Sequence, residues 1–310
     1  MAYDLTNYLV IGISSRALFD LTVENKIYER EGLEAYCQYQ LDHENDVLQP
    51  GSGFALIKAM LRINDIDPEN RLIEVVIMSR NSADTSLRIS NSIDHYGLDI
   101  TRAAFTGGEK VAKYLTAFDV DLFLSATEED VQAAVESRVA SGLIYEGLSK
   151  QSGETLEQIR IAFDGDAVLF SEESELIYQQ QGLDAFIEHE KKNADKPLPE
   201  GPFAKLLKTL SYLQFQLDGM DDGAAMIRTA LVTARNSPAH ERVIRTLRAW
   251  NVRVDETFFL GGVAKNQVLA AFAPHIFFDD QHLHCDHASK VVPTARVPYP
   301  KRPALIKASN

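Results

Sequence analysis

The sequence predicts an α/β protein made of two tandem, related Rossmann-like modules, each with a parallel sheet covered by helices. Three observations predict this fold. The chain has 310 residues, enough for about two ordinary domains. Short apolar runs alternate with amphipathic stretches, which is typical of parallel strands connected by helices. The two halves also repeat the same short motifs in the same order, which indicates two copies of one unit.

The repeat appears when the first half is placed over the second. Six motifs match in the same order, and the shift between them varies only from 150 to 155 residues. Three of these matches are RNS at 80–82 and 235–237, FTGG at 105–108 with FLGG at 259–262, and IYEREGLEAY at 27–36 with IYQQQGLDAF at 177–186. We therefore expect modules at 1–150 and 151–310, separated by a polar boundary near 146–157 that contains two glycines.

Each copy is expected to contain the same elements in the same order. They are a strand (8–13; 158–163), a polar insertion with helical patterning, a strand (73–78; 228–233), a helix beginning near Ser82 or Ser237, a strand (101–105; 255–259), a Gly-Gly turn, a helix (109–118; 263–272) and a strand (121–125; 275–279). The apolar runs predict strands because a parallel strand is covered on both faces. Ser82 and Ser237, the latter followed by proline, suit helix N-caps.

Composition narrows the classes of partner. The net charge of −14 argues against a nucleic-acid polymer or an anionic membrane surface. A small phosphorylated ligand stays open, because a metal and a few cations can reverse the field locally. Two cysteines make no disulfide framework and fit a reducing compartment. The start of the chain is unlike a signal peptide and no apolar run reaches membrane-spanning length, so we expect a cytoplasmic protein.

Carboxylates follow two predicted strands of the second copy. Asp164 and Asp166 follow the strand at 158–163, Asp279 ends the strand at 275–279, and Asp280 comes directly after it. Ligands of α/β proteins bind at the carboxyl ends of parallel strands, so these groups should meet at one edge. Carboxylate oxygens suit a hard divalent cation. The pattern therefore predicts a metal site there.

Groups that suit a phosphate are expected at the same edge. Thr233 ends a strand and supplies a hydroxyl, and Lys265 supplies a positive charge at the start of a helix. Backbone N–H groups near Ala234 and Arg235 can hold phosphate oxygens. A metal, cations and an attacking aspartate are what phosphoryl transfer to a carboxylate requires.

The motifs IAFDGDAVLFSEESE, VTARN, Lys265 and FFDDQ, in this order, resemble the haloacid dehalogenase-like phosphatase superfamily. The residues within these motifs resemble those of the cytosolic 5′-nucleotidase I family. The first-half motifs SSRALFD, SRNS and FTGG also resemble that family, so the resemblance covers nearly the whole chain. It implies a Mg²⁺-dependent enzyme that hydrolyses AMP-like or IMP-like nucleoside 5′-monophosphates through an aspartyl-phosphate. Two alternatives stay open: a phosphatase or phosphotransferase acting on another small phosphometabolite, and a non-catalytic nucleotide-binding or scaffold protein.

The resemblance also implies residue roles. Asp164 would be the nucleophile and a Mg²⁺ ligand, and Asp166 the general acid and then the base, binding Mg²⁺ through its backbone carbonyl. Thr233 and Lys265 would hold the phosphoryl group during its transfer. Asp279 would be the other Mg²⁺ ligand, and Asp280 would ligate the metal or orient a water molecule bound to it.

The first copy lacks these side chains. In the order Asp164, Asp166, Thr233, Lys265, Asp279 and Asp280, the facing residues are Ser14, Arg16, Met78, Val111, Ser125 and Ala126. We expect one active site per chain and a catalytically dead first module that buttresses the second, helps to form its pocket or binds a regulatory nucleotide. The last idea rests on an edge that suits an anion, formed by Ser14, Arg16, Ser79, Gly107 and Gly108.

Four further expectations concern the second half. The interval between Asp164 and Thr233 leaves room for a helical cap at about 171–225, whose rings (Tyr178, Phe186, Phe203, Tyr212, Phe215) include candidates for stacking on a base. The repetition of Arg235 and Asn236 in the first copy favours a structural role for both. The run at 188–193 is interpreted as a solvated helix end, and HLHCDH at 282–287 as a loop lining the mouth of the site. The packing of the two modules, face to face or side by side, and a homo-oligomer both stay open.

Overall fold

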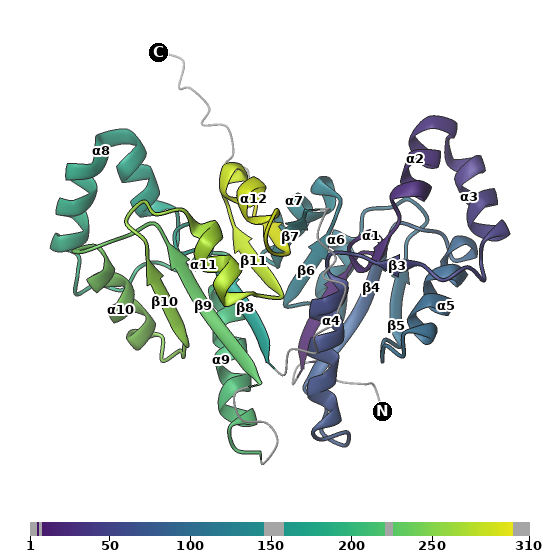
Figure 1. Cartoon of the computed structure of the whole chain (residues 1–310), viewed down its shortest axis with the longest axis horizontal. Coiled ribbons are helices and arrows are strands. Elements are labelled where there is room, and N and C mark those ends of the chain that lie inside the picture. The colour runs from purple at the N-terminus through teal and green to yellow at the C-terminus, as the bar shows by residue number, and fades with distance from the viewer. Residues whose placement is uncertain (1–4, 6–7, 146–157, 221–225, 300–310) are drawn as a thin grey trace.

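The computed structural model describes residues 5, 8–145, 158–220 and 226–299. One ten-stranded sheet runs through both halves in the order β10-β9-β8-β11-β12-β7-β6-β1-β4-β5 (Figure 1). All neighbouring strands in it are parallel except the central pair, in which β7 (Ala140–Ile144) and β12 (Thr294–Arg296) are antiparallel. The expected α/β class is confirmed, but the two expected parallel sheets form one mixed sheet, with the halves side by side.

The strand order is the same on both sides of the central pair. The first half reads outward as β7, β6 (Leu122–Ser125), β1 (Leu9–Ile13), β4 (Ile73–Ser79) and β5 (Arg102–Phe105). The second half reads outward as β12, β11 (Ile276–Asp279), β8 (Ile159–Phe163), β9 (Ile227–Thr233) and β10 (Glu256–Phe259). The inner strands β1, β4, β6 and β11 are buried along their whole length, which explains their nearly continuous apolar sequences. A separate two-stranded sheet pairs β2 (Phe19–Asp20) with β3 (Gln49–Pro50).

Helices cover both faces of the large sheet. In the first half they are α1 (Ser15–Leu18), α2 (Thr22–Glu31), α3 (Leu33–Asp42), α4 (Phe54–Leu61), α5 (Leu87–His95), α6 (Ala112–Leu115) and α7 (Glu128–Glu136), with 3₁₀ turns at Arg62–Asp65, Asp84–Ser86 and Thr116–Phe118. In the second half they are α8 (Glu173–Lys192), α9 (Ala204–Leu217), α10 (His240–Ala249), α11 (Lys265–Phe272) and α12 (His282–Ala288). Among the described residues, no helix combines the length and apolarity needed to cross a membrane.

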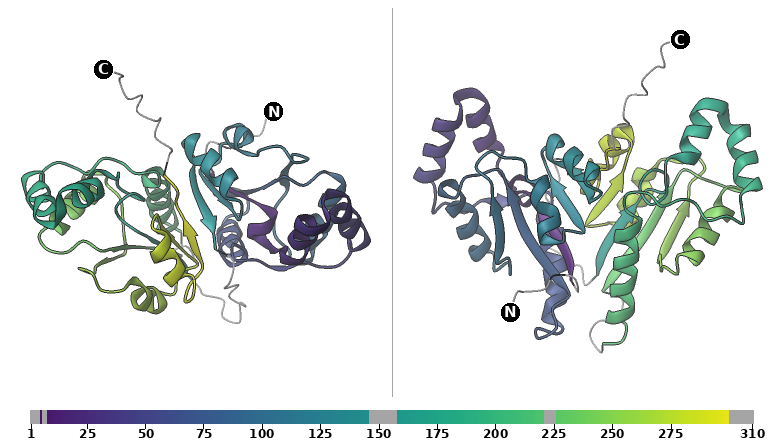
Figure 2. Two further views of the ribbon diagram at one scale, coloured as in Figure 1. Left: turned by 90° about the horizontal axis from the view of Figure 1, so that it is seen from above. Right: turned by 180° about the vertical axis from the view of Figure 1, so that it is seen from behind.

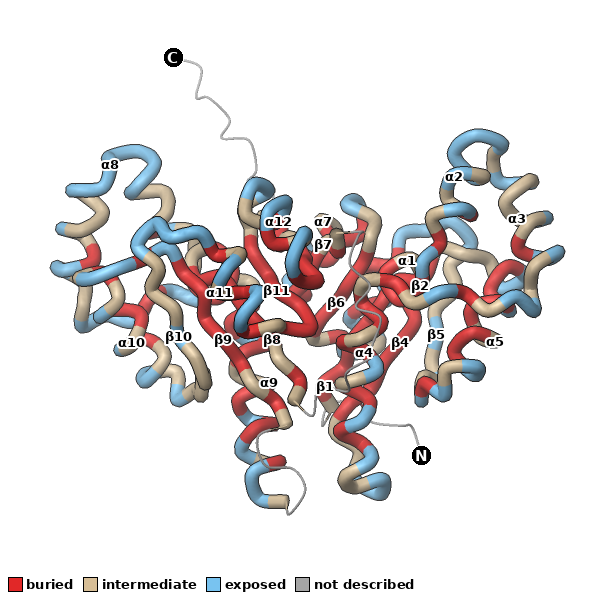
Figure 3. The backbone as a smooth tube through the Cα atoms, in the orientation of Figure 1, coloured by how far each residue is buried: buried red, intermediate tan, exposed pale blue. Residues whose placement is uncertain are grey.

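The apolar core is continuous between the halves. Its largest cluster contains β1 and β4 residues of the first half together with β8 and α9 residues of the second. Smaller clusters lie on the other face, one in each half. Figure 3 shows the buried residues concentrated in the central strands, whereas α2, α3 and α8 are mostly half-buried or exposed. Figures 1 and 2 show α8 at one end of the molecule and the α2–α3 pair at the other.

Two sequence expectations about helices need correction. The helices expected near Ser82 and Ser237 begin later, at Leu87 and His240. Ser82 instead accepts a hydrogen bond from the Thr85 backbone N–H in the preceding turn, and the N-cap of α10 is Ala239. The serines lie in the loops that follow β4 and β9, so the chain must first turn away from the sheet.

The region expected to form a cap, 171–225, divides into two parts. Helix α9 packs its apolar side into the sheet core, and Phe203 just before it is fully buried against Phe163 and Phe278. Helix α8 lies outside that core and is interrupted at Gly182, where φ is 84° and ψ is −179°. Residues 221–225, like the expected module boundary at 146–157, lie outside the described residues. Among the described residues of this region, α8 is the helix that lies outside the sheet core and could serve as a cap.

Candidate active site

Three neighbouring strands bring the predicted site residues to one edge of the sheet. Strand β8 lies between β9 and β11, and Phe163 at its end is the register partner of Phe278. The next residues along these two strands, Asp164 and Asp279, therefore stand side by side. The backbone N–H of Asp164 donates to the Phe278 carbonyl at 2.8 Å, which fixes this register.

Lys265 lies between these two aspartates. It is the first residue of α11, and its Nζ donates to Asp164 Oδ1 and to Asp279 Oδ2, each at 2.6 Å. All three side chains are buried. Burial alone would lower the pKa of Lys265, but the two carboxylates outweigh that effect and hold it above its ordinary value. The lysine therefore stays charged at this edge.

Asp280 adds a third carboxylate to the pair. Oxygens of Asp164, Asp279 and Asp280 all lie within 4.8 Å of one another. Burial, with the nearby charges of Asp164 and Asp279, raises the pKa of Asp280 to about 8. Burial also raises the pKa of Asp164 to about 7, against the opposing effect of Lys265. The raised pKa values mean that all three carboxylates ionise together only at a cost, which a bound cation would offset.

The cluster fits a divalent cation. Asp280 Oδ1 is buried and finds no hydrogen-bond partner among the residues that the structure describes. A cation among the three carboxylates would coordinate that oxygen. It would also offset the negative charge of the carboxylates that the single ammonium group of Lys265 does not neutralise. An all-oxygen ligand set favours a hard ion such as Mg²⁺, Ca²⁺ or Mn²⁺.

Asp166 is bound by an arginine and not by Lys265. Arg235 Nε donates to Asp166 Oδ2 at 2.8 Å, and Arg235 Nη2 donates to Asp166 Oδ1 at 2.6 Å. The same guanidinium donates through Nη1 to Glu190 Oε2 at 2.5 Å on helix α8. The pKa of Arg235 is raised because these carboxylates outweigh its burial. Arg235 thus connects Asp166, the predicted general acid, to helix α8.

Glu190 is the residue that the sequence interpretation missed. The run 188–193 was expected to be a solvated helix end, but Glu190 is only 2% exposed. Besides Arg235, it accepts from Arg242 Nη1 at 3.0 Å and from Ser174 Oγ at 2.8 Å. The interpretation was wrong for Glu190, whose carboxylate faces inward, although α8 does end at Lys192 and the other residues of the run are exposed or half-buried.

Thr233 and Ala234 lie at the end of β9, beside the loop that follows β8. Thr233 is buried, and its Oγ1 accepts from the Arg235 backbone N–H at 3.2 Å. A side chain at Gly165 would come within 3.2 Å of that Oγ1, so the loop after β8 packs directly against Thr233. Ala234 lines a small cavity of about 140 Å³ together with Lys265 and His284.

The segment 282–287 is a helix, α12, and not the expected loop. Cys285 is buried and its Sγ donates to the Asp279 carbonyl at 3.4 Å, while His284 Nδ1 lies 3.3 Å from Asp279 Oδ2. Lys265 and His284 outweigh the burial of Asp279 and hold its pKa below the ordinary value. His282 is exposed and pairs with the Tyr145 hydroxyl at 3.1 Å. The helix therefore supports Asp279, and its two later histidines, 284 and 287, reach the small cavity.

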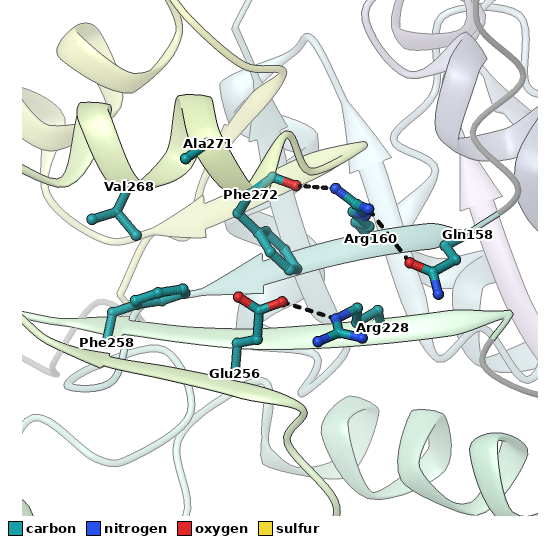
Figure 4. A pocket seen from close by; sticks show the side chains of 8 residues that line it. All are labelled: Gln158, Arg160, Arg228, Glu256, Phe258, Val268, Ala271 and Phe272. Atoms are coloured by element: carbon teal, nitrogen blue, oxygen red, sulfur yellow. Dashed lines mark hydrogen bonds and ion pairs between the residues drawn. The ribbon is translucent and has the colours of Figure 1, made fainter.

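Another cavity, of about 400 Å³, lies at the opposite ends of the strands, beside the start of β8 and β10 (Figure 4). Its charged groups already have partners. Arg228 Nε donates to Glu256 at 2.8 Å, and Arg160 Nη1 donates to the Phe272 carbonyl at 2.9 Å. This cavity is remote from the acid cluster and brings together no group suited to phosphoryl transfer.

Comparison with protein families matches residues 1–304 to the family described as 5′-nucleotidase. Among curated proteins, the chain is similar to human "Cytosolic 5′-nucleotidase 1B", with 40% identity over 292 residues. That match covers 92% of this chain and 48% of the human protein, so the chain spans about half the length of the curated relative. No solved structure matches the chain.

Proposed function

The chain belongs to the 5′-nucleotidase family, and we propose that it is a Mg²⁺-dependent phosphoric monoester hydrolase acting on nucleoside 5′-monophosphates of the AMP or IMP type. The observation that carries this proposal is the buried Lys265 between Asp164 and Asp279, beside the unpartnered oxygen of Asp280. We further propose that it acts in the cytosol, as the name of the human relative indicates for that protein.

In the proposed reaction, an oxygen of Asp164 attacks the phosphorus atom and the bond from phosphorus to the nucleoside 5′-oxygen breaks. Asp166 donates a proton to that leaving oxygen. Water then attacks the aspartyl-phosphate while Asp166 takes up a proton, which releases phosphate and restores Asp164.

Lys265 and the Thr233 hydroxyl would hold the phosphoryl oxygens, helped by the backbone around Ala234 and Arg235. The carboxylates of Asp164, Asp279 and Asp280, with the backbone carbonyl of Asp166, would hold Mg²⁺, which would offset the charge of the phosphate. Lys265 would then exchange part of its contact with the aspartates for contact with the substrate.

The contact between Arg235 and Asp166 has a consequence for this scheme. Both Asp166 oxygens accept hydrogen bonds from Arg235, so Asp166 must leave the guanidinium before it can donate to the leaving oxygen. Since Arg235 also holds Glu190 on α8, we propose that substrate binding moves α8 and releases Asp166. Phe186, whose ring lies 5.4 Å from the Arg235 guanidinium, is the ring of α8 best placed to stack on a base.

We also propose that the chain consists of two related modules, 1–150 and 151–310, and that only the second is catalytic. Hydrogen bonds that recur at the shifts of the sequence repeat support the duplication. Ser92 Oγ accepts from the Leu48 N–H at 3.0 Å and donates to the Arg88 carbonyl at 2.8 Å; Thr246 does the same with Leu198 and Arg242, at 2.9 and 2.7 Å.

Aromatic pairs and backbone angles recur in the same way. Tyr28 and Tyr36 meet edge to face with ring centroids 6.1 Å apart, and Tyr178 and Phe186 do so at 6.3 Å. The Gly-Gly turns at 107–108 and 261–262 also share their positive φ angles. Because the first half has no carboxylate at positions 14, 125 and 126, it has neither a nucleophilic aspartate nor a carboxylate ligand set for a metal there.

Phosphate release from a panel of nucleoside monophosphates and sugar phosphates, with Mg²⁺ or EDTA, tests the proposed activity. We expect Mg²⁺-dependent release from nucleoside monophosphates in preference to sugar phosphates. Faster release from a sugar phosphate would favour a phosphatase acting on another metabolite. No release from any substrate would leave a binding or scaffold protein as the better interpretation.

A further inference from the structure

Tyr299 stands at the same edge of the sheet as the acid cluster. Strand β12 lies beside β11, with Arg296 as the register partner of Asp279, and the Val297 backbone N–H donates to the Asp279 carbonyl at 2.9 Å. Tyr299 follows two residues later. Val297 and Tyr299 each precede a proline, which favours extended backbone at both residues. The chain after β12 therefore leaves the sheet beside the acid cluster.

The first half holds this segment in place. From α7, Gln132 Nε2 donates to the Tyr299 carbonyl at 2.9 Å. Three residues earlier in the segment, Arg296 Nη2 donates to Glu128 Oε1 of the same helix at 2.6 Å. The contact at residue 299 uses its backbone carbonyl, so it positions the residue without occupying the hydroxyl of the side chain.

The Tyr299 hydroxyl is buried and, within the described part of the chain, has no hydrogen-bond partner. Leaving a buried hydroxyl without a partner costs free energy, and a ligand that accepts its hydrogen bond would remove that cost. Burial raises the pKa of this hydroxyl, and so do the charges of four acids: Asp280, Glu172, Asp166 and Asp164. The hydroxyl therefore keeps its proton and offers a hydrogen-bond donor close to these acids.

The counterpart of Tyr299 in the first half does have a partner. Tyr145 occupies the corresponding position, since ASGLIY at 140–145 lies over TARVPY at 294–299 in the sequence repeat. The Tyr145 hydroxyl pairs with His282 Nδ1 at 3.1 Å, and the two rings meet edge to face. Two tyrosines at equivalent positions thus differ in whether the hydroxyl is used. The unused hydroxyl belongs to the half that contains the acid cluster.

The strand order separates Tyr299 from Thr233, which is proposed to hold the phosphoryl oxygens. Thr233 ends β9, on one side of β8, whereas β11 and β12 follow on the other side. The acids at the ends of β8 and β11 therefore stand between Thr233 and Tyr299. A substrate whose phosphoryl group contacts Thr233 would reach Tyr299 only with the part that lies beyond the phosphorus atom. Asp166, the proposed proton donor to the leaving oxygen, is among the acids that act on Tyr299.

We propose that Tyr299 is a substrate-binding residue whose hydroxyl donates a hydrogen bond to a ribose hydroxyl oxygen of the nucleoside 5′-monophosphate. The 2′- and 3′-hydroxyls are neutral acceptors that lie beyond the leaving oxygen. The first half would then contribute to the site, because Gln132 positions Tyr299. The choice of a nucleotide rests on the proposed function, whereas the buried hydroxyl and its position do not.

Equilibrium binding to the full chain with Asp164→Asn tests the proposal without consuming the ligand. Isothermal titration calorimetry in Mg²⁺ compares AMP, 2′-deoxy-AMP and 3′-deoxy-AMP. Adding Tyr299→Phe should raise the dissociation constant of AMP about fivefold, the effect of one hydrogen bond. It should leave the constant of one deoxy analogue unchanged, because that analogue lacks the hydroxyl that Tyr299 binds. The control Tyr145→Phe, which loses an exposed contact with His282, should leave all three constants unchanged.

An unchanged dissociation constant for AMP in Tyr299→Phe would overturn the proposal, as would a failure of AMP to bind when Tyr299 is intact. An equal rise for AMP and both deoxy analogues would also overturn it, because a general disturbance of the site weakens every ligand alike. Hydrolysis of AMP by the chain with Asp164 intact is measured in parallel. Absence of hydrolysis, with binding that depends on Tyr299 as expected, counts against the proposed function alone.

Discussion

Arg235 binds both carboxylate oxygens of Asp166, through Nε at 2.8 Å and Nη2 at 2.6 Å. The planar guanidinium makes two parallel hydrogen bonds that an ammonium group cannot reproduce. Its third nitrogen binds Glu190, so one buried arginine joins the loop after β8 to helix α8. The position of α8 and the availability of Asp166 are therefore coupled through a single side chain.

Replacing Arg235 should destabilise the protein strongly. Arg235→Lys removes the paired hydrogen bonds and leaves buried Glu190 with fewer partners, so we expect a loss of roughly 3 kcal/mol in the free energy of unfolding. Urea denaturation measures this loss. The control is Arg228→Lys, whose partner Glu256 is about a third exposed, with an expected loss below about 1 kcal/mol. Equal losses in both variants would show that the buried contacts of Arg235 add no more stability than an exposed ion pair.

Asp164→Asn should abolish hydrolysis and keep the fold. The amide is nearly the same size but is a far weaker nucleophile, and Lys265 keeps its contact with Asp279. We expect kcat to fall by at least about a thousandfold, with little change in the far-ultraviolet circular dichroism. Ser14→Ala, at the corresponding position of the first half, should leave kcat unchanged. Retained activity in Asp164→Asn would refute the assignment of the nucleophile.

Mg²⁺ should stabilise the folded chain through the acid cluster. At one hundred times its dissociation constant, the ion should add about 2.7 kcal/mol to the free energy of unfolding, because it binds the native state. Thermal melts with increasing Mg²⁺ measure this effect, and EDTA should reverse it.

Asp280→Asn should shift the Mg²⁺ titration to higher concentrations, because it removes one of the three carboxylates. Asp286→Asn, a change at a half-exposed aspartate on α12, should leave the titration unchanged. Identical titrations of both variants would exclude Asp280 from the metal site.

The strands could be predicted from the sequence because burial on both faces demands apolar runs. The placement of Asp164 and Asp279 could be predicted from these strands, because the carboxyl ends of parallel strands lie at the same edge of a sheet. Strands β7 and β12 could not be predicted, because a short segment such as Thr294–Arg296 becomes a strand only through the partner it pairs with. Their antiparallel pairing also decides that the halves lie side by side.

Contacts between charged side chains could not be predicted from the sequence either. Glu190 stands in a run of charged residues, and only the fold brings it to Arg235 and Arg242. Helix α12 was taken for a loop because its histidines and cysteine carry no clear helical pattern. The burial of Cys285 against the Asp279 carbonyl gives this helix its inner face.

The glycines at the bends of the outer helices offer a test of the duplication. Gly32, between α2 and α3, has φ 87° and ψ −175°, and Gly182 within α8 has φ 84° and ψ −179°. These angles belong to a region that is nearly restricted to glycine. An added Cβ would meet nothing within 4 Å at either position, so the cost of a side chain is backbone strain alone.

We therefore expect Gly32→Ala and Gly182→Ala to lower the free energy of unfolding by similar amounts, about 1–3 kcal/mol each, as measured by urea denaturation. The two bends lie at opposite ends of the molecule, so the losses should add in the double variant. Gln180→Ala, an exposed change two residues from Gly182, should have little effect. A large loss of unfolding free energy at one glycine and none at the other would mean that the two bends differ in backbone strain. That result would count against a common origin of the two halves.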